Sequence, residues 1–555
     1  MTLIKRISIV VFASLLVCST LFLTAFKPVS DLFEISKNID IFTSVYKELN
    51  TYYVDDIDPN KVMRTGIDAM LESLDPYTNY ISEAEMEGYK FQVTGNYGGI
   101  GATIRPIDDR LTITDVFEGF PAEKSGLKAG DLLLSVDGFD VSEINNEISE
   151  LLRGSPGSKV LLKIFRPYLD QEIELEVVRE EVNLGNVPYY GMVNDKIGYI
   201  ILSQFTDNAG RNVENAFLEL KEENPELAGI ILDVRGNPGG LLREAVNISN
   251  IFIDKGKEVV STRSRIAEWD KTFLSINPAV DTEIPLAILT SRSSASASEI
   301  VAGVIQDYDR GVIIGQKSFG KGLVQTTRDI SYKTKLKLTT AKYYIPSGRC
   351  VQAINYAQRN EDGSVGKIPD SLKVAFTTNS GRTVYDGGGI DPDILTEENN
   401  YNKITLSLLR GNHIFNYVTQ YVAERTDSIE SRGFSLSDEE YNSFVEYLSD
   451  KDYDYTTETE LVLDDLEATA EKEKRSEAMG KEIASLREKI AADKQKDLMK
   501  FKDEILYELN REIAGRYHYF SGRVESSFDK DPDIQSAINI LLDREAYNNI
   551  LTSQN

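Results

Sequence analysis

The fold class follows from four apolar runs, GYIILSQF (Gly198–Phe205), IILDV (Ile230–Val234), IPLAILT (Ile284–Thr290) and VII (Val312–Ile314). Each run has the length of a buried strand, and stretches with helical spacing separate them. Parallel strands read as continuous apolar runs because their crossover helices bury both faces of the sheet. The sequence therefore predicts an α/β core over residues 184–395.

A different pattern precedes this core, with short strands and tight turns over residues 91–183. We expect strands at Leu111–Val116, Leu132–Val136, Lys159–Phe165 and Glu172–Val178, and one helix over Ser142–Leu152. Turn signals such as Asp137-Gly138 separate the strands. These features predict a small β-rich domain with one helix.

Helical segments flank both domains. Residues 30–90 carry apolar side chains at helical spacing, and the pair Asp75-Pro76 interrupts the pattern. Residues 396–555 are rich in charge and show the same spacing. A solvated helical bundle, a dimerisation arm and an element that gates substrate access all fit this C-terminal pattern.

The first 29 residues have the pattern of a targeting segment. Lys5 and Arg6 precede the uncharged run Ile7–Phe26, which has the length of about 20 residues that a helix needs to cross a bilayer. A cleaved signal peptide and an uncleaved anchor both fit, whereas a lipoprotein signal at Cys18 fits less well because Val17 is bulky. Either way, the remainder is expected to be exported, to the bacterial periplasm or to the outer face of the inner membrane.

Composition narrows the classes of function. The chain of 555 residues has 61 Lys+Arg against 89 Asp+Glu, a formal net charge of −28. Such a protein repels phosphate and anionic lipid, so no nucleic-acid partner is expected and membrane contact is expected only through the N-terminal segment. Both histidines, His413 and His518, lie in the C-terminal region. A Ser-His-Asp, Cys-His or zinc-histidine site is therefore excluded from residues 1–400.

The run SSASASE (Ser293–Glu299) joins a predicted strand to a predicted helix. A serine on such a turn lies where the helix dipole stabilises developing negative charge, which suits a nucleophile. Ser296 and Glu299 also have the spacing of a capping box, so an ordinary helix start is the simpler explanation of this motif by itself.

With no histidine available, a lysine is the candidate base. It must be neutral to act, which requires that burial lower its pKa from about 10.4. Lys321 lies between glycines in FGKGLVQ (Phe319–Gln325). If this stretch is extended, Lys321 and Gln325 face the same side, and Gln325 can orient the amine. Taken alone, a lysine between glycines is usually a loop residue.

The run LDVRGNPGGL (Leu232–Leu241) is a strand that leads into a glycine-rich turn and then a helix. Backbone N–H groups presented by such a turn can form an oxyanion hole. A phosphate-binding loop is the alternative, but the Walker spacing that ends in Gly-Lys-Ser/Thr is missing.

In the β-rich domain, GGIGA (Gly98–Ala102) lets consecutive N–H groups converge on an anion such as a terminal carboxylate. A glycine-rich hairpin without a ligand is the alternative for this loop alone. Together with Pro121-Ala122, Ser125–Leu127 and Ala129–Asp131, the loop resembles that of a PDZ domain. Such domains capture a C-terminal peptide as an added strand.

In their order, these motifs resemble the carboxyl-terminal processing peptidases, also called tail-specific proteases, over about residues 40–395. IPSGR (Ile345–Arg349) and GIDPD (Gly389–Asp393) add to the resemblance. Arg292, Ser293 and Ile345 depart from the family's common residues without removing a needed chemical group. The resemblance implies a PDZ domain inserted before a ClpP/crotonase-like α/β serine protease core, between N-terminal and C-terminal helical regions. It does not extend to the last 160 residues.

The resemblance also implies roles for particular residues. Ser296 would be the nucleophile, Lys321 the general base and Gln325 the third member of the catalytic set. The oxyanion hole would come from Ala297 and from Gly239 or Gly240. The peptide carboxylate would bind at Gly99, Ile100, Gly101 and Ala102.

We therefore interpret the sequence as a cell-envelope serine endopeptidase with a Ser296–Lys321 dyad. It would bind protein substrates by their exposed apolar C-termini through the PDZ domain, and this mechanism requires no metal or cofactor. The alternatives are a catalytically silent PDZ scaffold and a binding protein for apolar ligands on the same core. Intact Ser296, Lys321 and Gln325 argue against both. The sequence leaves the oligomeric state open, a homo-oligomer included.

Overall fold

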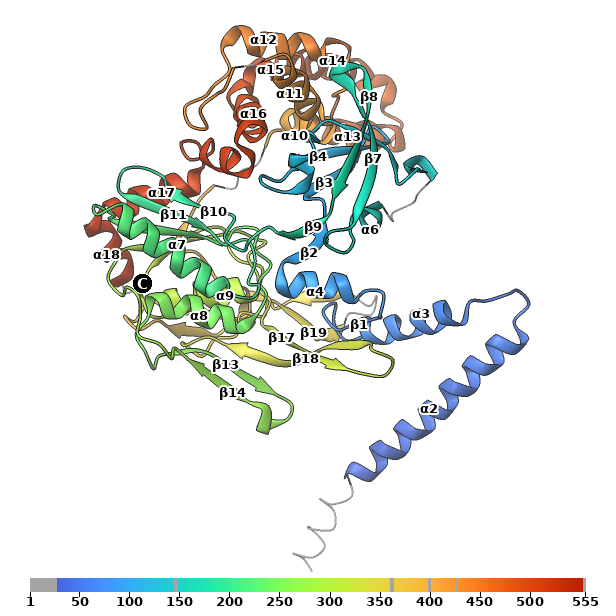
Figure 1. The fold of residues 1–555 in the computed structure, drawn as a ribbon, viewed down its shortest axis with the longest axis vertical. Coiled ribbons are helices and arrows are strands. Elements are labelled where there is room, and N and C mark those ends of the chain that lie inside the picture. Colours follow the sequence, from blue (N-terminus) through green and yellow to red (C-terminus); the bar gives the residue numbers. More distant parts are fainter. Residues whose placement is uncertain (1–26, 144–147, 360–363, 398–400, 426, 553–555) are drawn as a thin grey trace, which may run out of the picture. The chain divides into compact units, whose positions relative to one another are not determined.

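The structure, a computed structural model, describes residues 27–143, 148–359, 364–397, 401–425 and 427–552. The chain divides into two compact units, one of residues 1–81 with 327–338 and the other of residues 82–326 with 339–555 (Figure 1). The apolar run predicted to be a targeting segment lies outside the described residues. Within the described ranges, no helix combines the length and apolar character of a membrane span.

The first unit contains helices α2 (Lys27–Tyr52) and α3 (Pro59–Glu72) and strand β1 (Asn79–Ile81). Helix α3 begins after Asp58, whose side chain accepts a hydrogen bond from the Asn60 N–H at 2.8 Å, with Pro59 in the first turn. Strand β1 pairs antiparallel with the beginning of β18 (Lys335–Tyr344). The predicted helices are therefore present, while β1 is a strand that the helical spacing did not predict.

The second unit begins with α4 (Met86–Thr94) and the β-rich domain. Strands β2 (Asn96–Gly99) and β9 (Glu180–Asn183) pair antiparallel, which brings the two ends of this domain together. Its main sheet has the order β3-β4-β5-β7-β8. The strands and short helices are β3 (Ala102–Ile107), β4 (Arg110–Val116), α5 (Pro121–Lys124), β5 (Leu132–Val136), β6 (Phe139–Asp140), β7 (Lys159–Arg166), η2 (Pro167–Leu169) and β8 (Gln171–Val178).

The helix predicted over Ser142–Leu152 lies partly outside the described residues. A 3-10 turn, η1 (Val141–Glu143), and the short helix α6 (Ile148–Leu152) stand at its two ends, and residues 144–147 lie outside the description. Asp140 contributes to the early turn, because its carboxylate accepts hydrogen bonds from the N–H and the hydroxyl of Ser142. Such local bonding of an aspartate is typical of the residue that precedes a helical turn.

The predicted α/β core is confirmed. Its sheet has the order β10-β11-β12-β15-β16-β23, and β11, β12, β15 and β16 are parallel to their neighbours in this series. The strands are β10 (Tyr189–Met192), β11 (Ile197–Ile201), β12 (Gly229–Asp233), β15 (Leu286–Thr290), β16 (Val312–Gly315) and β23 (Ile394–Leu395). The four apolar runs of the sequence supply the strands at the centre of this sheet.

Helices cover both faces of the core sheet (Figure 1). Alternate strand residues such as Ile230 and Ile288 pack with α7 (Ala209–Glu223), α8 (Leu242–Phe252) and α9 (Ala297–Asp307). Their neighbours Ile231 and Leu289 pack with α17 (Pro532–Leu542) and α18 (Arg544–Thr552). The end of the predicted C-terminal helical region is thus part of the core packing.

A further group of strands extends the core beyond this sheet. β13 pairs antiparallel with both β14 and β18. β13 (Glu258–Ser264), β14 (Lys271–Leu274) and β17 (Leu323–Asp329) share a sheet with β18. Two separate two-stranded sheets are formed by β19 (Ile354–Arg359) with β20 (Val365–Lys367) and by β21 (Ala375–Thr377) with β22 (Thr383–Tyr385). The 3-10 turns η3 (Ala267–Trp269) and η4 (Asp370–Leu372) lie between strands.

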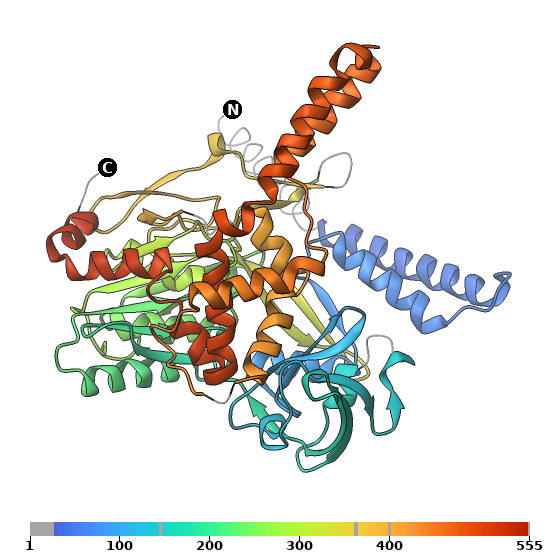
Figure 2. The same cartoon turned by 90° about the horizontal axis from the view of Figure 1, so that it is seen from above.

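The remaining C-terminal helices have an apolar core of their own, which includes Leu408, Val418, Phe444 and Leu509. Helices α13 (Glu458–Lys472) and α14 (Ser476–Lys494) lie side by side, drawn in orange-red in Figure 2, and are linked by an ion pair between Arg487 and Glu467. The other helices are α10 (Lys403–Arg410), α11 (His413–Ala423), α12 (Asp438–Tyr447), η5 (Leu448–Asp450), α15 (Asp497–Lys500) and α16 (Lys502–Glu525).

Candidate active site

Ser296 lies on the turn between β15 and α9, immediately before the first residue of the helix. Its backbone has φ +56° and ψ −110°, a conformation that residues other than glycine rarely adopt. A strained turn of this kind between a strand and a helix is typical of an exposed nucleophilic serine. The Ser296 side chain is half-buried.

The neighbouring serines have structural partners instead. The buried Ser294 hydroxyl donates to the carbonyl of Val234 at 2.7 Å. The buried Ser298 hydroxyl donates to the carbonyl of Asn237 at 3.0 Å. Both bonds tie the serine-rich segment to the glycine-rich turn that follows β12, so these two hydroxyls hold the turns together.

Glu299 joins the Ser296 turn to the loop that carries Lys321. Its Oε2 accepts hydrogen bonds from the backbone N–H of Ser296 and of Lys321, each at 2.8 Å. Its Oε1 accepts from the Ser318 hydroxyl at 2.6 Å and from the Gly320 N–H at 2.7 Å. The carboxylate is fully buried, and this burial raises its pKa. One carboxylate therefore fixes the backbone at both predicted catalytic residues.

Tyr343, on β18, provides a second link between these segments. Its hydroxyl donates to the Ser296 carbonyl at 3.2 Å, and its N–H donates to the Gly322 carbonyl at 3.0 Å. The ring is buried, which raises the pKa of the phenol well above its usual value. The sequence analysis did not predict this role, because no local pattern connects residue 343 with residues 296 and 322.

Lys321 and Gln325 lie on either side of the start of β17. Lys321 is half-buried and precedes the strand, whereas Gln325 is within it. The Gln325 amide donates to the Thr339 hydroxyl at 3.1 Å. This bond orients the Gln325 side chain toward β18.

The glycine-rich turn lies directly beside Ser296. A Cβ atom added to Gly239 would be 2.9 Å from Ser296 Cβ and 3.0 Å from the Ala297 nitrogen, so the approach requires glycine. The Gly239 N–H donates to Asn237 Oδ1 at 2.8 Å, within the same turn. The Gly240 N–H has no hydrogen-bond partner in the described part of the chain. Of the two glycines predicted for the oxyanion hole, Gly240 thus has the N–H that is not already used.

The predicted carboxylate-binding loop connects β2 to β3. Gly101 has φ +78°, and the carbonyls of Ile100 and Gly101 accept hydrogen bonds from the N–H groups of Ala122 and Phe117. Strand β3 stands at one end of its sheet order. An edge strand next to a loop whose carbonyls are already bonded suits the addition of a peptide strand. Over the described residues, no group of His, Cys, Asp or Glu side chains is arranged to hold a metal ion.

Family models match the chain in three places. Residues 98–177 match the PDZ domain, residues 196–359 match peptidase family S41, and residues 404–541 match a probable PDZ-protease C-terminal helical domain. The carboxy-terminal-processing protease of Bartonella bacilliformis is 35% identical over 321 residues, which cover 57% of this chain and 73% of that protein. The chain belongs to the family of the carboxy-terminal-processing proteases.

Other proteins are also similar to this chain. A probable CtpA-like serine protease of Staphylococcus aureus is 34% identical over 57% of this chain, which matches 62% of that protein's length. Among solved structures, the photosystem II D1 C-terminal processing protease is similar, with a TM-score of 0.35, 24% identity, and coverage of 64% of this chain and 92% of that one. The predicted order of a PDZ domain followed by a serine peptidase domain is confirmed. The helical-domain match covers the region for which the sequence analysis found no resemblance.

Proposed function

We propose that this member of the family hydrolyses peptide bonds with Ser296 as the nucleophile and Lys321 as the general base. The observation that carries the proposal is the buried carboxylate of Glu299, which bonds the backbone of both residues at 2.8 Å. Two segments of the core are thereby held together at a serine whose backbone is strained.

The chemistry needs only these side chains and water. Neutral Lys321 accepts the Ser296 hydroxyl proton as Oγ attacks the peptide carbonyl carbon, and the N–H groups of Ala297 and Gly240 stabilise the oxyanion. The C–N bond breaks as the leaving amine takes the proton from Lys321. Water then attacks the acyl-enzyme and gives one proton to Lys321, which passes it to Ser296 Oγ as the acyl–oxygen bond breaks. The new carboxyl group loses its remaining proton to solvent, and Ser296 and neutral Lys321 are restored. Gln325 would orient the amine, directly or after exchanging its bond to Thr339.

We infer that substrates are proteins with exposed apolar C-termini. The PDZ domain would capture the terminal carboxylate at Gly99–Ala102 and the preceding residues along β3. The uncharged run Ile7–Phe26 supports export of the chain. The enzyme would therefore act in the bacterial cell envelope, outside the cytoplasm.

The test compares Ser296→Ala and Lys321→Ala with Ser293→Ala, a matched control whose side chain is exposed. We expect cleavage of a tailed protein to fall about 1,000-fold or more in the first two variants, because the two residues act as one unit. Ser293→Ala should remain active. Turnover by Ser296→Ala at the rate of the unsubstituted enzyme would refute the assignment.

The same assay separates the two alternatives. A silent scaffold would bind a free C-terminal peptide but show no turnover even without substitution. A binding protein for apolar ligands would show neither turnover nor a preference for a free C-terminal carboxylate.

A further inference from the structure

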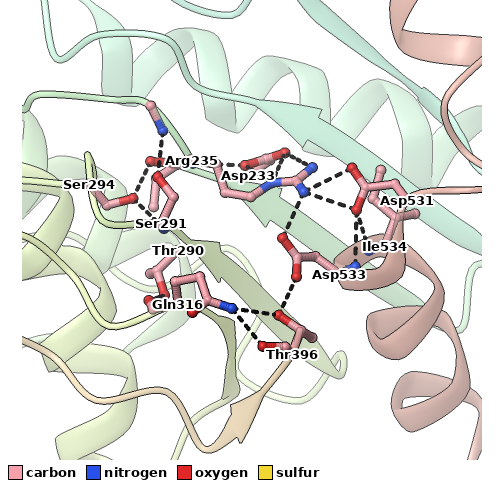
Figure 3. Close-up of polar contacts among 12 residues, drawn as sticks. Asp233, Arg235, Thr290, Ser291, Ser294, Gln316, Thr396, Asp531, Asp533 and Ile534 are labelled. Atoms are coloured by element: carbon pink, nitrogen blue, oxygen red, sulfur yellow. Dashed lines mark hydrogen bonds and ion pairs between the residues drawn. The ribbon is translucent and has the colours of Figure 1, made fainter. Parts of the chain in front are cut away.

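Arg235 anchors the glycine-rich turn to the far end of the chain (Figure 3). Its Nη1 lies 2.9 Å from Asp531 Oδ2 and 2.8 Å from Asp533 Oδ2. Its Nη2 and Nε both bond the carboxylate of Asp233, at 2.7 and 3.0 Å from Oδ2. One guanidinium therefore joins the end of β12 to the beginning of α17, nearly 300 residues later in the sequence.

The two distant aspartates are themselves fixed. Asp531 is the N-cap of α17, since its Oδ1 accepts hydrogen bonds from the N–H groups of Asp533 at 3.0 Å and Ile534 at 3.2 Å. Asp533 Oδ1 accepts from the Thr396 hydroxyl at 2.5 Å. The Thr396 carbonyl accepts in turn from the Gln316 amide at 2.7 Å. Helix α17 is thus bound to the loops that follow β16 and β23 as well as to Arg235.

The residues next to Arg235 connect it with the serine-rich segment. The Gly236 N–H donates to the Ser291 hydroxyl at 3.0 Å, and the Ser291 N–H donates to the Ser294 hydroxyl at 2.9 Å. Ser294 then donates to the carbonyl of Val234 (Figure 3). These hydrogen bonds join the turn that contains Gly240 to the turn that contains Ser296.

Carboxylates outnumber cationic side chains around Arg235. One guanidinium faces the carboxylates of Asp233, Asp531 and Asp533, and the Tyr199 hydroxyl donates to Asp233 at 2.5 Å. Helix α17 also packs its apolar side chains on the core sheet through Ile534 and Leu541. The ion pairs of Asp531 and Asp533 with Arg235 are therefore additional to the apolar contacts that bury this helix.

From this geometry we propose that Asp531 and Asp533, acting through Arg235, are positioning residues for the oxyanion turn. The C-terminal helix α17 would then set the rate of the chemical step at Ser296, although it touches no substrate. This inference rests on the proposed function, because it assumes that Gly240 and Ala297 stabilise the transition state.

The test removes charge while preserving the helix start. Asparagine is as good an N-cap as aspartate at position 531, and at position 533 its amide oxygen can still accept from Thr396. Asp531→Asn, Asp533→Asn and the double variant therefore remove the ion pairs to Arg235. We expect kcat for a tailed protein to fall about 10-fold or more in the double variant, with KM within about twofold, as for the loss of an interaction made only in the transition state. Asp533→Glu, which keeps the charge at a position other than the N-cap, should recover most of the rate lost in Asp533→Asn. Asp529→Asn is the matched control, because Asp529 is exposed and precedes the helix by a few residues.

Each outcome distinguishes a positioning role from a structural one. Thermal unfolding and near-ultraviolet circular dichroism are measured on every variant, and kinetics are run at a temperature where all are folded. If the double variant does not fold, Asp533→Asn and Arg235→Lys are compared, since lysine keeps the charge and loses the planar fork. Unchanged kcat in folded variants, or a loss confined to KM, would overturn the proposal. Ser296→Ala is assayed in parallel, and activity there would overturn the proposed function instead.

Discussion

Glu299 shows how much of the site depends on one residue. A buried carboxylate is costly unless its oxygens are hydrogen-bonded, and here both oxygens accept two bonds each. Two of those donors are the N–H groups of Ser296 and Lys321. Its loss would therefore move both residues without removing either side chain.

Glu299→Gln should lower kcat about 10-fold or more while leaving binding of a tail peptide unchanged. The amide puts an NH₂ donor where one acceptor oxygen was, so it faces at least one backbone N–H, which is itself a donor that it cannot bond. Glu460→Gln is the matched control, because Glu460 completes a capping box with Thr457 at the start of α13. Equal kcat in Glu299→Gln and in the unsubstituted enzyme would contradict the role given to this carboxylate.

The same pair of variants has a signed pH dependence. Burial raises the pKa of Glu299 above its unfolded value, so the protonated form favours the fold. Its stabilising contribution is complete below the unfolded pKa and is lost as the pH rises through the folded pKa. The stability of the unsubstituted enzyme relative to Glu299→Gln should thus decrease as the pH rises from the ordinary pKa of a glutamate through the raised pKa of the folded state, as measured by urea unfolding.

At this scale the sequence predicts local contacts well. The capping-box spacing predicts the bond from the Ser296 N–H to Glu299, which is present. The use of the Gly239 N–H by Asn237, two residues earlier, is a local turn of the kind that asparagine favours and could have been predicted. The bonds from Glu299 to Gly320 and Lys321 could not, because they depend on how two strands of the core sheet lie beside each other.

At the scale of elements, the two predicted binding sites, one for the peptide carboxylate and one for the oxyanion, both lie on turns that contain glycines with positive φ. Gly101 in the PDZ loop has φ +78°, and an added Cβ would be 2.4 Å from Phe120 Cβ. Gly119 has the same φ, and an added Cβ there would meet nothing within 4 Å. A substitution at Gly119 therefore introduces backbone strain alone, whereas the same substitution at Gly101 introduces backbone strain and a steric clash.

Gly101→Ala should weaken binding of a free C-terminal peptide about 10-fold or more, since the clash displaces the loop that binds the carboxylate. Gly119→Ala should change binding by no more than about twofold, although both variants bear a strain of about 1 kcal/mol at a positive φ. Isothermal titration with the same peptide measures both. Equal weakening in the two variants would show that the loop conformation is not what recognises the peptide.

Strand positions in the core followed from the apolar runs, because strands buried on both faces leave that pattern whatever surrounds them. Of the helix predicted over Ser142–Leu152, the described residues include only the two ends, η1 and α6.

At the scale of the molecule, the C-terminal helices contact both functional domains of the second unit. Helix α16 is kinked at His518 and Tyr519, and the Tyr519 hydroxyl donates to Glu123 of the PDZ domain at 2.5 Å. Arg523 forms an ion pair with Asp115 of the same domain, at 2.6 Å. Further along, α17 packs on the core sheet and bonds Arg235. Helical spacing predicts such helices. An apolar stripe does not specify the surface on which it packs, so these contacts could not be predicted from the sequence.

The central proposal is that the PDZ domain binds the C-terminal tail of a protein substrate and that Ser296 then acts as the nucleophile that cleaves it. One comparison of kcat/KM tests this proposal most directly. Two protein substrates are used that differ only in a free or an amidated C-terminus, with intact-mass spectrometry following cleavage and Ser296→Ala as the blank. Amidation removes the charge that strengthens hydrogen bonds from the Gly99–Ala102 N–H groups. We expect the free C-terminus to be processed about 10-fold or more efficiently, and neither substrate to be cut by Ser296→Ala. Equal kcat/KM for the two substrates, or cleavage by Ser296→Ala, would contradict the proposal.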